Sequence, residues 1–234
     1  MDSKANFRNA CNNGNLEEAK NLYYNNHIVN DYAQVCKNII FTDTCRHGQL
    51  HIAKWLLEIM PNIDVSANSE EAFRMACNRG HIQIAQWLLE LNPSTNIFIC
   101  DDFAFSCACA NGHLNVAQWL WSLNQYINVS AGNEFAFRIA CQNGHLHVAK
   151  WLLSIKPSIN ISQYNECAFR HACDYGHSSV AKWLSTVNPF KYSVVDYDPK
   201  IIWNKWKIHD NNKYDTLCLL FGIIYKGYDV SVLY

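Results

Sequence analysis

The fold of this chain is decided by residues 140–153, whose sequence is ACQNGHLHVAKWLL. Gly144 lies near the centre of this stretch, where a glycine can adopt the left-handed backbone that ends a helix. The matching residues 69–93 carry apolar side chains at helical spacing on both sides of the glycine: Ala72, Phe73, Ala76 and Cys77 before it, and Ile82, Ala85, Leu88 and Leu89 after it. The pattern predicts two short antiparallel helices joined by a tight turn.

This pattern repeats along the chain with a period of 32 residues. Five columns of identical residues keep the period: Phe41, Phe73, Phe105, Phe137 and Phe169; Cys45, Cys77, Cys109, Cys141 and Cys173; Gly48, Gly80, Gly112, Gly144 and Gly176; Ala53, Ala85, Ala117, Ala149 and Ala181; Trp55, Trp87, Trp119, Trp151 and Trp183. An earlier unit, from Phe7 to Ala19, fits the template but has Asn21 in the tryptophan column. Because one unit cannot bury its own apolar stripes, the period predicts stacked units that share a continuous core.

Each unit also carries signals for where its helices begin and end. The first helix has a column of polar side chains that can accept hydrogen bonds from its free N–H groups: Ser69, Asp101, Asn133 and Asn165. The second helix is followed by a column of prolines that cannot continue it: Pro61, Pro93, Pro157 and Pro189. Apolar alternation between the units, as in Ile127/Val129 and Ile159/Ile161, predicts an extended or hairpin-like connector.

Residues 140–153 resemble the helix-turn-helix of an ankyrin repeat, A-A-x-x-G-H-x-x-V-V-x-L-L-L, and four other units match about as well. The chain departs from the family where Glu71-Ala72-Phe73-Arg74 replaces Thr-Pro-Leu-His and where Asn92-Pro93 replaces Gly-Ala. The Ala-Lys-Trp-Leu variant with Asn-Pro is similar to the ankyrin-repeat proteins of giant DNA viruses of amoebae.

The resemblance implies an all-α, ankyrin-type helix-turn-helix solenoid of about six repeats plus a degenerate C-terminal capping unit. We expect residues 1–35 to form an N-terminal capping repeat, residues 36–190 to form four to five stacked repeats, and residues 191–234 to form the degenerate capping repeat and an aromatic tail.

The residues in the repeated columns are better explained by structural roles than by chemical ones. We expect the tryptophans to pack against the neighbouring unit and to contribute most to the core, with a binding platform as the alternative. Each unit pairs a cysteine with a histidine, as in Cys77/His81, but two ligands per unit make an incomplete zinc site, so no metal is expected. Equivalent cysteines in stacked units lie about 10 Å apart, beyond disulfide reach. The column Arg8, Arg74, Arg138 and Arg170 is expected to hydrogen-bond and pack between units.

Composition narrows the class of protein. Half of the residues are hydrophobic and the formal net charge is −1 at pH 7, which disfavours nucleic acid and anionic membranes as partners. The polar N-terminus, the short apolar runs and the 11 cysteines predict a soluble cytoplasmic protein with reduced thiols, in the host cytoplasm if the protein is viral. Every prominent His and Cys has a structural explanation and no phosphate-binding loop is present, so we expect neither an enzyme nor a cofactor.

The leading hypothesis is a module that binds a partner protein on the concave face, which the resemblance to ankyrins assigns to the first helices and the connector tips. The positions that vary between units are the candidates for contact: Met75, Arg79, Asp102, Cys107, Asn111, Ile139, Asn143, Tyr164, His171 and Tyr175. Tyr164, His171, Tyr175 and Arg79 are the preferred anchors because aromatic residues and arginine dominate binding hot spots.

The alternative hypothesis is a structural or self-associating element. It rests on the aromatic C-terminal unit, where Trp203, Trp206 and Tyr214 precede an apolar stretch that ends near Tyr225. Closing the stack is the simpler role for these aromatics, and a monomer is expected.

Overall fold

The computed structural model describes residues 3–25, 34–95 and 99–188, and in these residues the chain is an all-α helical repeat solenoid without strands. This confirms the predicted fold class. The helices are α1 (Ser3–Asn12), α2 (Leu16–Asn25), α3 (Gln34–Arg46), α4 (Leu50–Ile59), α5 (Ala67–Asn78), α6 (Ile82–Leu91), α7 (Ile99–Ala110), α8 (Leu114–Leu123), α9 (Ala131–Gln142), α10 (Leu146–Ile155), α11 (Gln163–Asp174) and α12 (Ser178–Val187). The predicted C-terminal capping unit, residues 191–234, lies outside the described residues.

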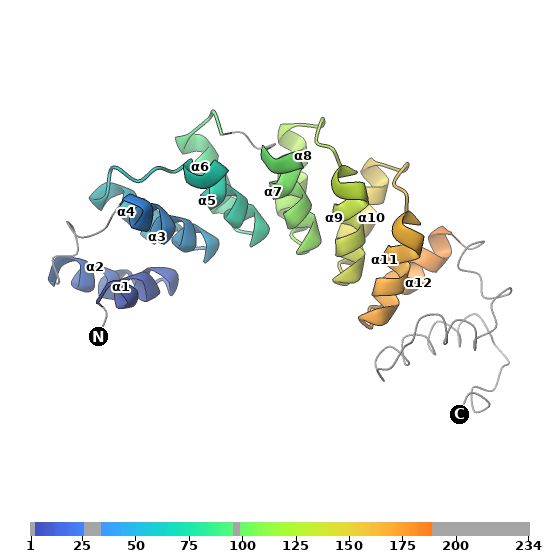
Figure 1. Cartoon of the computed structure of the whole chain (residues 1–234), viewed down its shortest axis with the longest axis horizontal. Helices are drawn as coiled ribbons and strands as arrows, with labels where there is room; N and C mark the ends of the chain where they lie inside the picture. The colour runs from blue at the N-terminus through green and yellow to red at the C-terminus, as the bar shows by residue number, and fades with distance from the viewer. Residues whose placement is uncertain (1–2, 26–33, 96–98, 189–234) are drawn as a thin grey trace, which may run out of the picture. The chain divides into compact units, whose positions relative to one another are not determined.

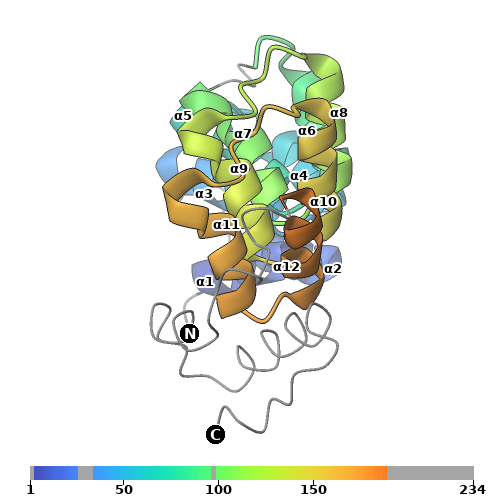
Figure 2. The ribbon, with the colours of Figure 1, turned by 90° about the vertical axis from the view of Figure 1, so that its right-hand side faces the viewer.

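The chain divides into two compact units. Unit 1 comprises residues 1–108 and 113–128, and unit 2 comprises residues 109–112 and 129–234. Within the units, helices pack against their partners across the turn, as α1 does against α2, α3 against α4 and α5 against α6 in unit 1, and as α9 does against α10 and α11 against α12 in unit 2 (Figure 1). The first helices of successive repeats also lie side by side, as α3 and α5 do in unit 1 and α9 and α11 do in unit 2 (Figure 2). The first helices therefore form one layer in each unit and the second helices form the other.

The core consists mainly of phenylalanine, leucine, alanine and cysteine side chains. The largest completely buried side chains are Phe7, Phe41, Phe73, Phe105, Phe137, Ile52, Leu56, Ile84, Leu120, Leu152 and Leu184. The cysteine column is fully buried, and all the cysteines that the structure describes are free thiols. Folding removes the apolar side chains at these positions from water. This burial is the main favourable contribution to the folding free energy of each repeat.

The tryptophans line the seam between repeats, but they are not its most buried part. Trp55 is buried, whereas the other four indoles are partly exposed. Indole rings meet the phenylalanine of the preceding repeat, with centroids 6.2 to 6.3 Å apart in the pairs Phe7–Trp55, Phe41–Trp87, Phe73–Trp119 and Phe137–Trp183. Part of each of these four large indoles therefore stays in solvent, whereas Trp55 also meets the Tyr23 ring at 5.7 Å and is buried.

The glycine turns end the first helices as predicted. The turn glycines from Gly14 to Gly176 have φ between 76° and 82°, the left-handed region that favours glycine. The histidine after each glycine reaches back to the preceding repeat, as His81 Nε2 does to the carbonyl oxygen of Arg46 at 3.0 Å. Gln49 occupies the equivalent place in an earlier repeat and donates to the Asn12 carbonyl at 3.4 Å. The histidines thus connect neighbouring repeats.

The predicted N-cap column was wrong, because its residues lie after the helix starts, and Ser69 and Asn133 lie inside a left-handed turn. Asn68, Ser69 and Glu70 have φ of 54°, 59° and 60°, and the α5 N-cap is Ser66, whose side chain makes no capping bond. Arg74 donates from Nε to the Ser69 carbonyl at 2.8 Å. Arg74 therefore closes this turn within its own repeat, and its hydrogen bonds offset the strain of non-glycine residues with positive φ. Arg8 of the same column instead pairs with Asp43 of the next repeat, as expected for a contact between units.

The same turn recurs in unit 2. Arg138 donates from Nε to the Asn133 carbonyl at 2.8 Å, and Asn133 and Glu134 both have positive φ. The carboxylate of Glu134 is buried and accepts from Ser130 Oγ at 2.7 Å and from the backbone N–H of Asn160 at 3.3 Å. A side chain from the turn thus also secures the connector that follows the second helix.

The connectors that the structure describes in full are compact turns instead of the predicted extended or hairpin-like segments. In the described residues no connector contains a strand, and Ile127, Val129 and Ile159 point into the core. The second helices end directly before the prolines, as α4 does at Ile59 with Met60 as C-cap and Pro61 after it. The apolar alternation that suggested an extended segment therefore reflects burial under a turn.

Candidate functional site

Four of the predicted contact residues occupy one column on the first helices. Met75 on α5 and Ile139 on α9 are partly exposed, and so is His171 on α11. Cys107 on α7 is only 7% exposed, so its prediction as a contact residue was wrong. The close packing between first helices covers a small side chain at this position and leaves a longer one accessible.

The turn positions are more accessible. Arg79, Asn111 and Asn143 are exposed, and Tyr175 is 60% exposed. The Asn143 side chain donates to the Ala110 carbonyl at 2.8 Å, so part of its hydrogen-bonding capacity is already used within unit 2. The side chain of Asp102 lies outside the described residues.

In unit 2 the structure brings two predicted anchors together at the end of α11, His171 in the last turn and Tyr175 at the C-cap. The rings of His171 and Tyr175 meet edge to face with centroids 6.1 Å apart. His171 Nδ1 lies 2.9 Å from Gln142 Oε1 on α9, and burial lowers the pKa of His171 below its usual value. Because the amide oxygen can only accept, the imidazole Nδ1 carries the proton and donates. The neutral imidazole thereby fixes the position of the more exposed tyrosine beside it.

Tyr164 lies at the start of α11 and is fixed by α9. Its ring lies under the Arg138 guanidinium, 4.8 Å from ring centroid to Cζ, and its hydroxyl accepts from Asn133 Nδ2 at 2.8 Å. The side chain is still 54% exposed. A large amphipathic ring that is both exposed and held in place loses little entropy on binding, which is the property of a hot-spot residue.

A cysteine lies close enough to His171 to suggest nucleophilic chemistry. Cys167 Sγ is 3.4 Å from His171 Nδ1, the same nitrogen that donates to Gln142. A nitrogen that donates to an amide cannot also accept the thiol proton, so only Nε2, which lies 3.8 Å from Cys167 Sγ, can accept it. The thiol is buried, which disfavours its ionised form, and the arrangement supports packing of α11 on α9.

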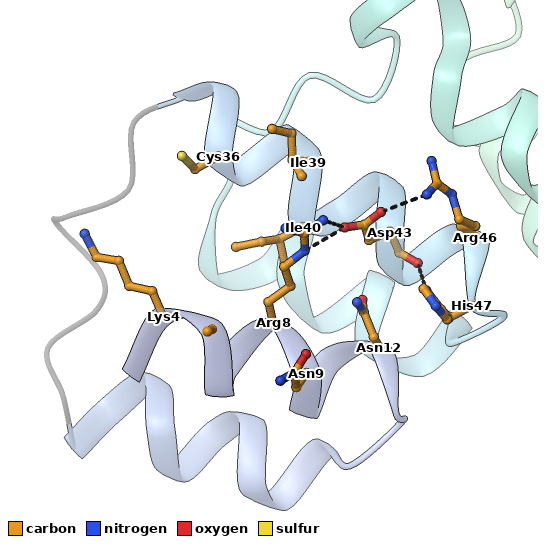
Figure 3. A pocket seen from close by; sticks show the side chains of 11 residues that line it. Lys4, Arg8, Asn9, Asn12, Cys36, Ile39, Ile40, Asp43, Arg46 and His47 are labelled. Carbon is orange, nitrogen blue, oxygen red and sulfur yellow. Dashed lines mark hydrogen bonds and ion pairs between the residues drawn. The ribbon is translucent and has the colours of Figure 1, made fainter. Parts of the chain in front are cut away.

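Sequence reasoning missed a groove between α1 and α3 in unit 1 (Figure 3). Its volume is about 580 Å³ and it is lined by Lys4, Ala5, Arg8, Asn9, Asn12, Cys36, Ile39, Ile40, Asp43, Arg46 and His47. Asp43 on α3 is buried, and its carboxylate accepts from Arg8 Nε at 2.7 Å and pairs with Arg46 at 3.5 Å. The backbone oxygen of Asp43 also meets His47 Nδ1 at 2.7 Å.

The repeat itself held the signal that could have found this groove. Asp43 lies 32 residues before Met75, and His47 lies 32 residues before Arg79, so both belong to the columns that vary between repeats. Extending those columns by one repeat towards the N-terminus predicts a charged first-helix surface. The groove forms because α1 and α3 lie side by side, and the columns alone do not predict this arrangement.

Other chemistry finds little support in the residues that the structure describes. Among them no group of three or more His, Cys, Asp or Glu side chains is placed to hold a metal ion. Burial raises the pKa of the Cys11 thiol to about 12 and raises the pKa of Cys45, Cys77, Cys141 and Cys173 as well, which disfavours reactive thiolates there. None of the described helices combines the length and the apolar character that crossing a bilayer requires.

Comparison with known proteins identifies the repeat. A search of curated proteins gave no significant match. The family model for ankyrin repeats in three copies matches residues 7–99, 41–131 and 105–194, which together cover most of the 234 residues. The repeat period, the glycine turns and the two layers of short helices agree with this match, so the chain belongs to the ankyrin-repeat family.

Proposed function

We propose that this protein is a non-catalytic module that binds a partner protein through the surface of its first helices. Ankyrin repeats are generally protein–protein interaction modules and are typically non-catalytic. The proposal adds the surface and the residues: in unit 2 the partner contacts Tyr164, His171 and Tyr175. The observation that carries it is the pair of exposed tyrosines at the two ends of α11, each held in place by neighbouring side chains.

The mechanism is recognition by a preorganised surface. Tyr164 is fixed by Arg138 and Asn133, and Tyr175 lies against His171, so few rotamers are lost when a partner covers them. A buried aromatic anchor contributes about 2 kcal/mol or more, which is roughly thirtyfold in affinity. The two tyrosines therefore account for most of the affinity of the unit 2 surface in this proposal.

Affinity capture with quantitative mass spectrometry tests the proposal. The tagged full chain is compared with the double variant Tyr164→Ala/Tyr175→Ala and with the control Tyr126→Ala, which removes a tyrosine that is 95% exposed in a connector. We expect the double variant to lose at least one protein that the wild type and the control both retain. Identical sets of captured proteins for all three chains, with unchanged melting temperatures, would refute the assignment of this surface.

Self-association through the C-terminal unit is the alternative function. It makes a different prediction, because the apparent mass of the full chain would rise with concentration in light scattering. A constant monomer mass would remove this alternative. Cytoplasmic location and membership of a giant-virus group stay predictions from the sequence.

A further inference from the structure

The second helices of the two units present surfaces of opposite charge. We infer that this chain associates with a second copy of itself, with the second-helix surface of unit 1 in one copy bound to the second-helix surface of unit 2 in the other. The inference goes beyond the proposed function, which uses the first helices.

The second-helix surface of unit 2 is basic. It comprises α10 and α12 with the turns and the connector next to them, residues 143–162 and 175–188, which contain three lysines and no carboxylate (Figure 2). Lys150 and Lys182 are exposed, and neither forms an ion pair with a described residue. The carboxylates in the described part of unit 2 all lie on first helices: Glu134, Glu166 and Asp174. The second-helix surface therefore favours an acidic partner.

The second-helix surface of unit 1 is acidic. Its helices α2, α4 and α6 carry four glutamates and two lysines, and α8 carries no charged residue. Both lysines are engaged, since Lys20 pairs with Glu17 at 3.6 Å and Lys54 lies over an indole ring of the next repeat, 5.9 Å from its centroid. Glu58 and Glu90 are exposed and form no ion pair with a described residue. Because Lys54 lies one helical turn before Glu58, Glu90 carries the less compensated charge.

The charges of the two surfaces match in spacing as well as in sign. Glu58 and Glu90 are one repeat apart on second helices, and so are Lys150 and Lys182. Neighbouring packed helices lie about 10 Å apart. The two carboxylates of one copy therefore have about the same separation as the two ammonium groups of the other, so both ion pairs can form in one contact.

Exposed apolar side chains lie beside these charges. The last residue of every second helix from α4 to α12 is apolar: Ile59, Leu91, Leu123, Ile155 and Val187. Leu91, Leu123 and Val187 are 37% to 46% exposed. Protein interfaces combine apolar contacts with a polar rim, and a second copy supplies both. A nucleic acid or an anionic membrane would match the lysines of unit 2 but would repel Glu90 next to Leu91 in unit 1.

Sedimentation velocity of the full chain over a range of concentrations tests this inference. We expect the wild type to shift from monomer to larger species as its concentration rises, and the shift to weaken as salt is raised, since the attraction is screened. Lys182→Glu should weaken the association about threefold to tenfold. The control Arg79→Glu makes the same charge change on an exposed turn after α5 and should alter it less than about twofold. Equal effects of the two variants would show that only overall charge matters and would overturn the inference.

Two charge-reversed chains give a sharper test. Glu58→Lys/Glu90→Lys makes both second-helix surfaces basic, and Lys150→Glu/Lys182→Glu makes both acidic. We expect neither variant to associate by itself, because its surfaces repel. An equimolar mixture of the two should associate about as strongly as the wild type, since each contact again joins opposite charges. A mixture that stays monomeric would refute the pairing of these surfaces.

The remaining outcomes separate this pairing from other forms of association. A wild type that stays monomeric overturns the inference, and if it also binds phosphatidylserine vesicles or duplex DNA through Lys150 and Lys182, the basic surface has another occupant. Equal association of the wild type and both charge-reversed chains overturns it as well and assigns the contact to the C-terminal unit. None of these results involves Tyr164 or Tyr175, so the proposed function stands or falls separately.

Discussion

The substitution Gly80→Ala tests how neighbouring repeats are connected. Gly80 has φ of 79°, and a Cβ added there would lie 2.5 Å from Nδ1 of His113 in the next repeat. His113 forms a hydrogen bond with the backbone of Asn78. The glycine is therefore required twice, once for its own backbone and once for the ring that packs on it.

The structure gives the magnitude. Left-handed backbone costs an alanine about 1 to 2 kcal/mol. The ring must also move away from the new methyl group and loses a hydrogen bond worth about 1 kcal/mol. We expect Gly80→Ala to lower the free energy of unfolding by roughly 2 to 3 kcal/mol. Gly132→Ala is the control, because Gly132 has φ of 61° and only the Phe135 side chain within 4 Å of an added Cβ, so about 1 to 2 kcal/mol is expected.

Urea unfolding followed by far-ultraviolet circular dichroism measures these free energies. A double-mutant cycle with His113→Ala separates the two costs, because Gly80→Ala should lose only the backbone cost when the ring is absent. A cost of Gly80→Ala below about 0.5 kcal/mol would refute the reasoning about the backbone. A cost that is the same with and without His113 would refute the reasoning about the ring.

Three further predictions follow from the same contacts. Burial lowers the pKa of His81 and His113 below the usual value of about 6.5, so protonation favours the unfolded chain. The melting temperature should therefore fall as the pH drops through about 6.5, and the double variant His81→Gln/His113→Gln should show a smaller fall. Leu120→Ala removes a side chain that is completely buried and should cost about 2 to 5 kcal/mol in urea unfolding, whereas Leu123→Ala on the exposed side of the same helix should cost less than about 1 kcal/mol. Arg138→Lys should destabilise unit 2 about as much as Arg138→Ala in thermal unfolding, because an ammonium group cannot reach both turn carbonyls as the guanidinium does; full stability of the lysine variant would contradict this role.

The periodic columns predicted most of the repeat because they report local structure. Gly80 and its equivalents have a left-handed backbone that few other residues adopt. Pro61 indicates the end of a helix because a proline cannot continue it. Both signals act within a few residues of the chain, so they do not depend on neighbours.

The errors arose where packing or a hydrogen bond from another residue decides the outcome. Ser69 resembles an N-cap by its type and position, but the guanidinium of Arg74 holds its carbonyl in a left-handed turn. Cys107 varies between units as a contact residue would, yet the neighbouring first helices bury it. The type of a residue does not determine which hydrogen bonds and contacts it makes once its helix is packed.

The candidate sites show the same division. Tyr164 and Tyr175 were predicted as anchors from their type and column, while the groove at Asp43 was missed although it belongs to the same columns.

The amino-acid sequence by itself determined the repeat, its two helices and the turn between them, because hydrophobic period and backbone preference are properties of short segments. Only the tertiary structure decided how deeply each indole is buried, which polar atoms of Asn12 and Arg46 remain unpaired, and which tyrosines stay exposed. These properties depend on which side chains of an adjacent repeat lie within a few ångströms. The spacing of residues along the chain does not determine these distances in space.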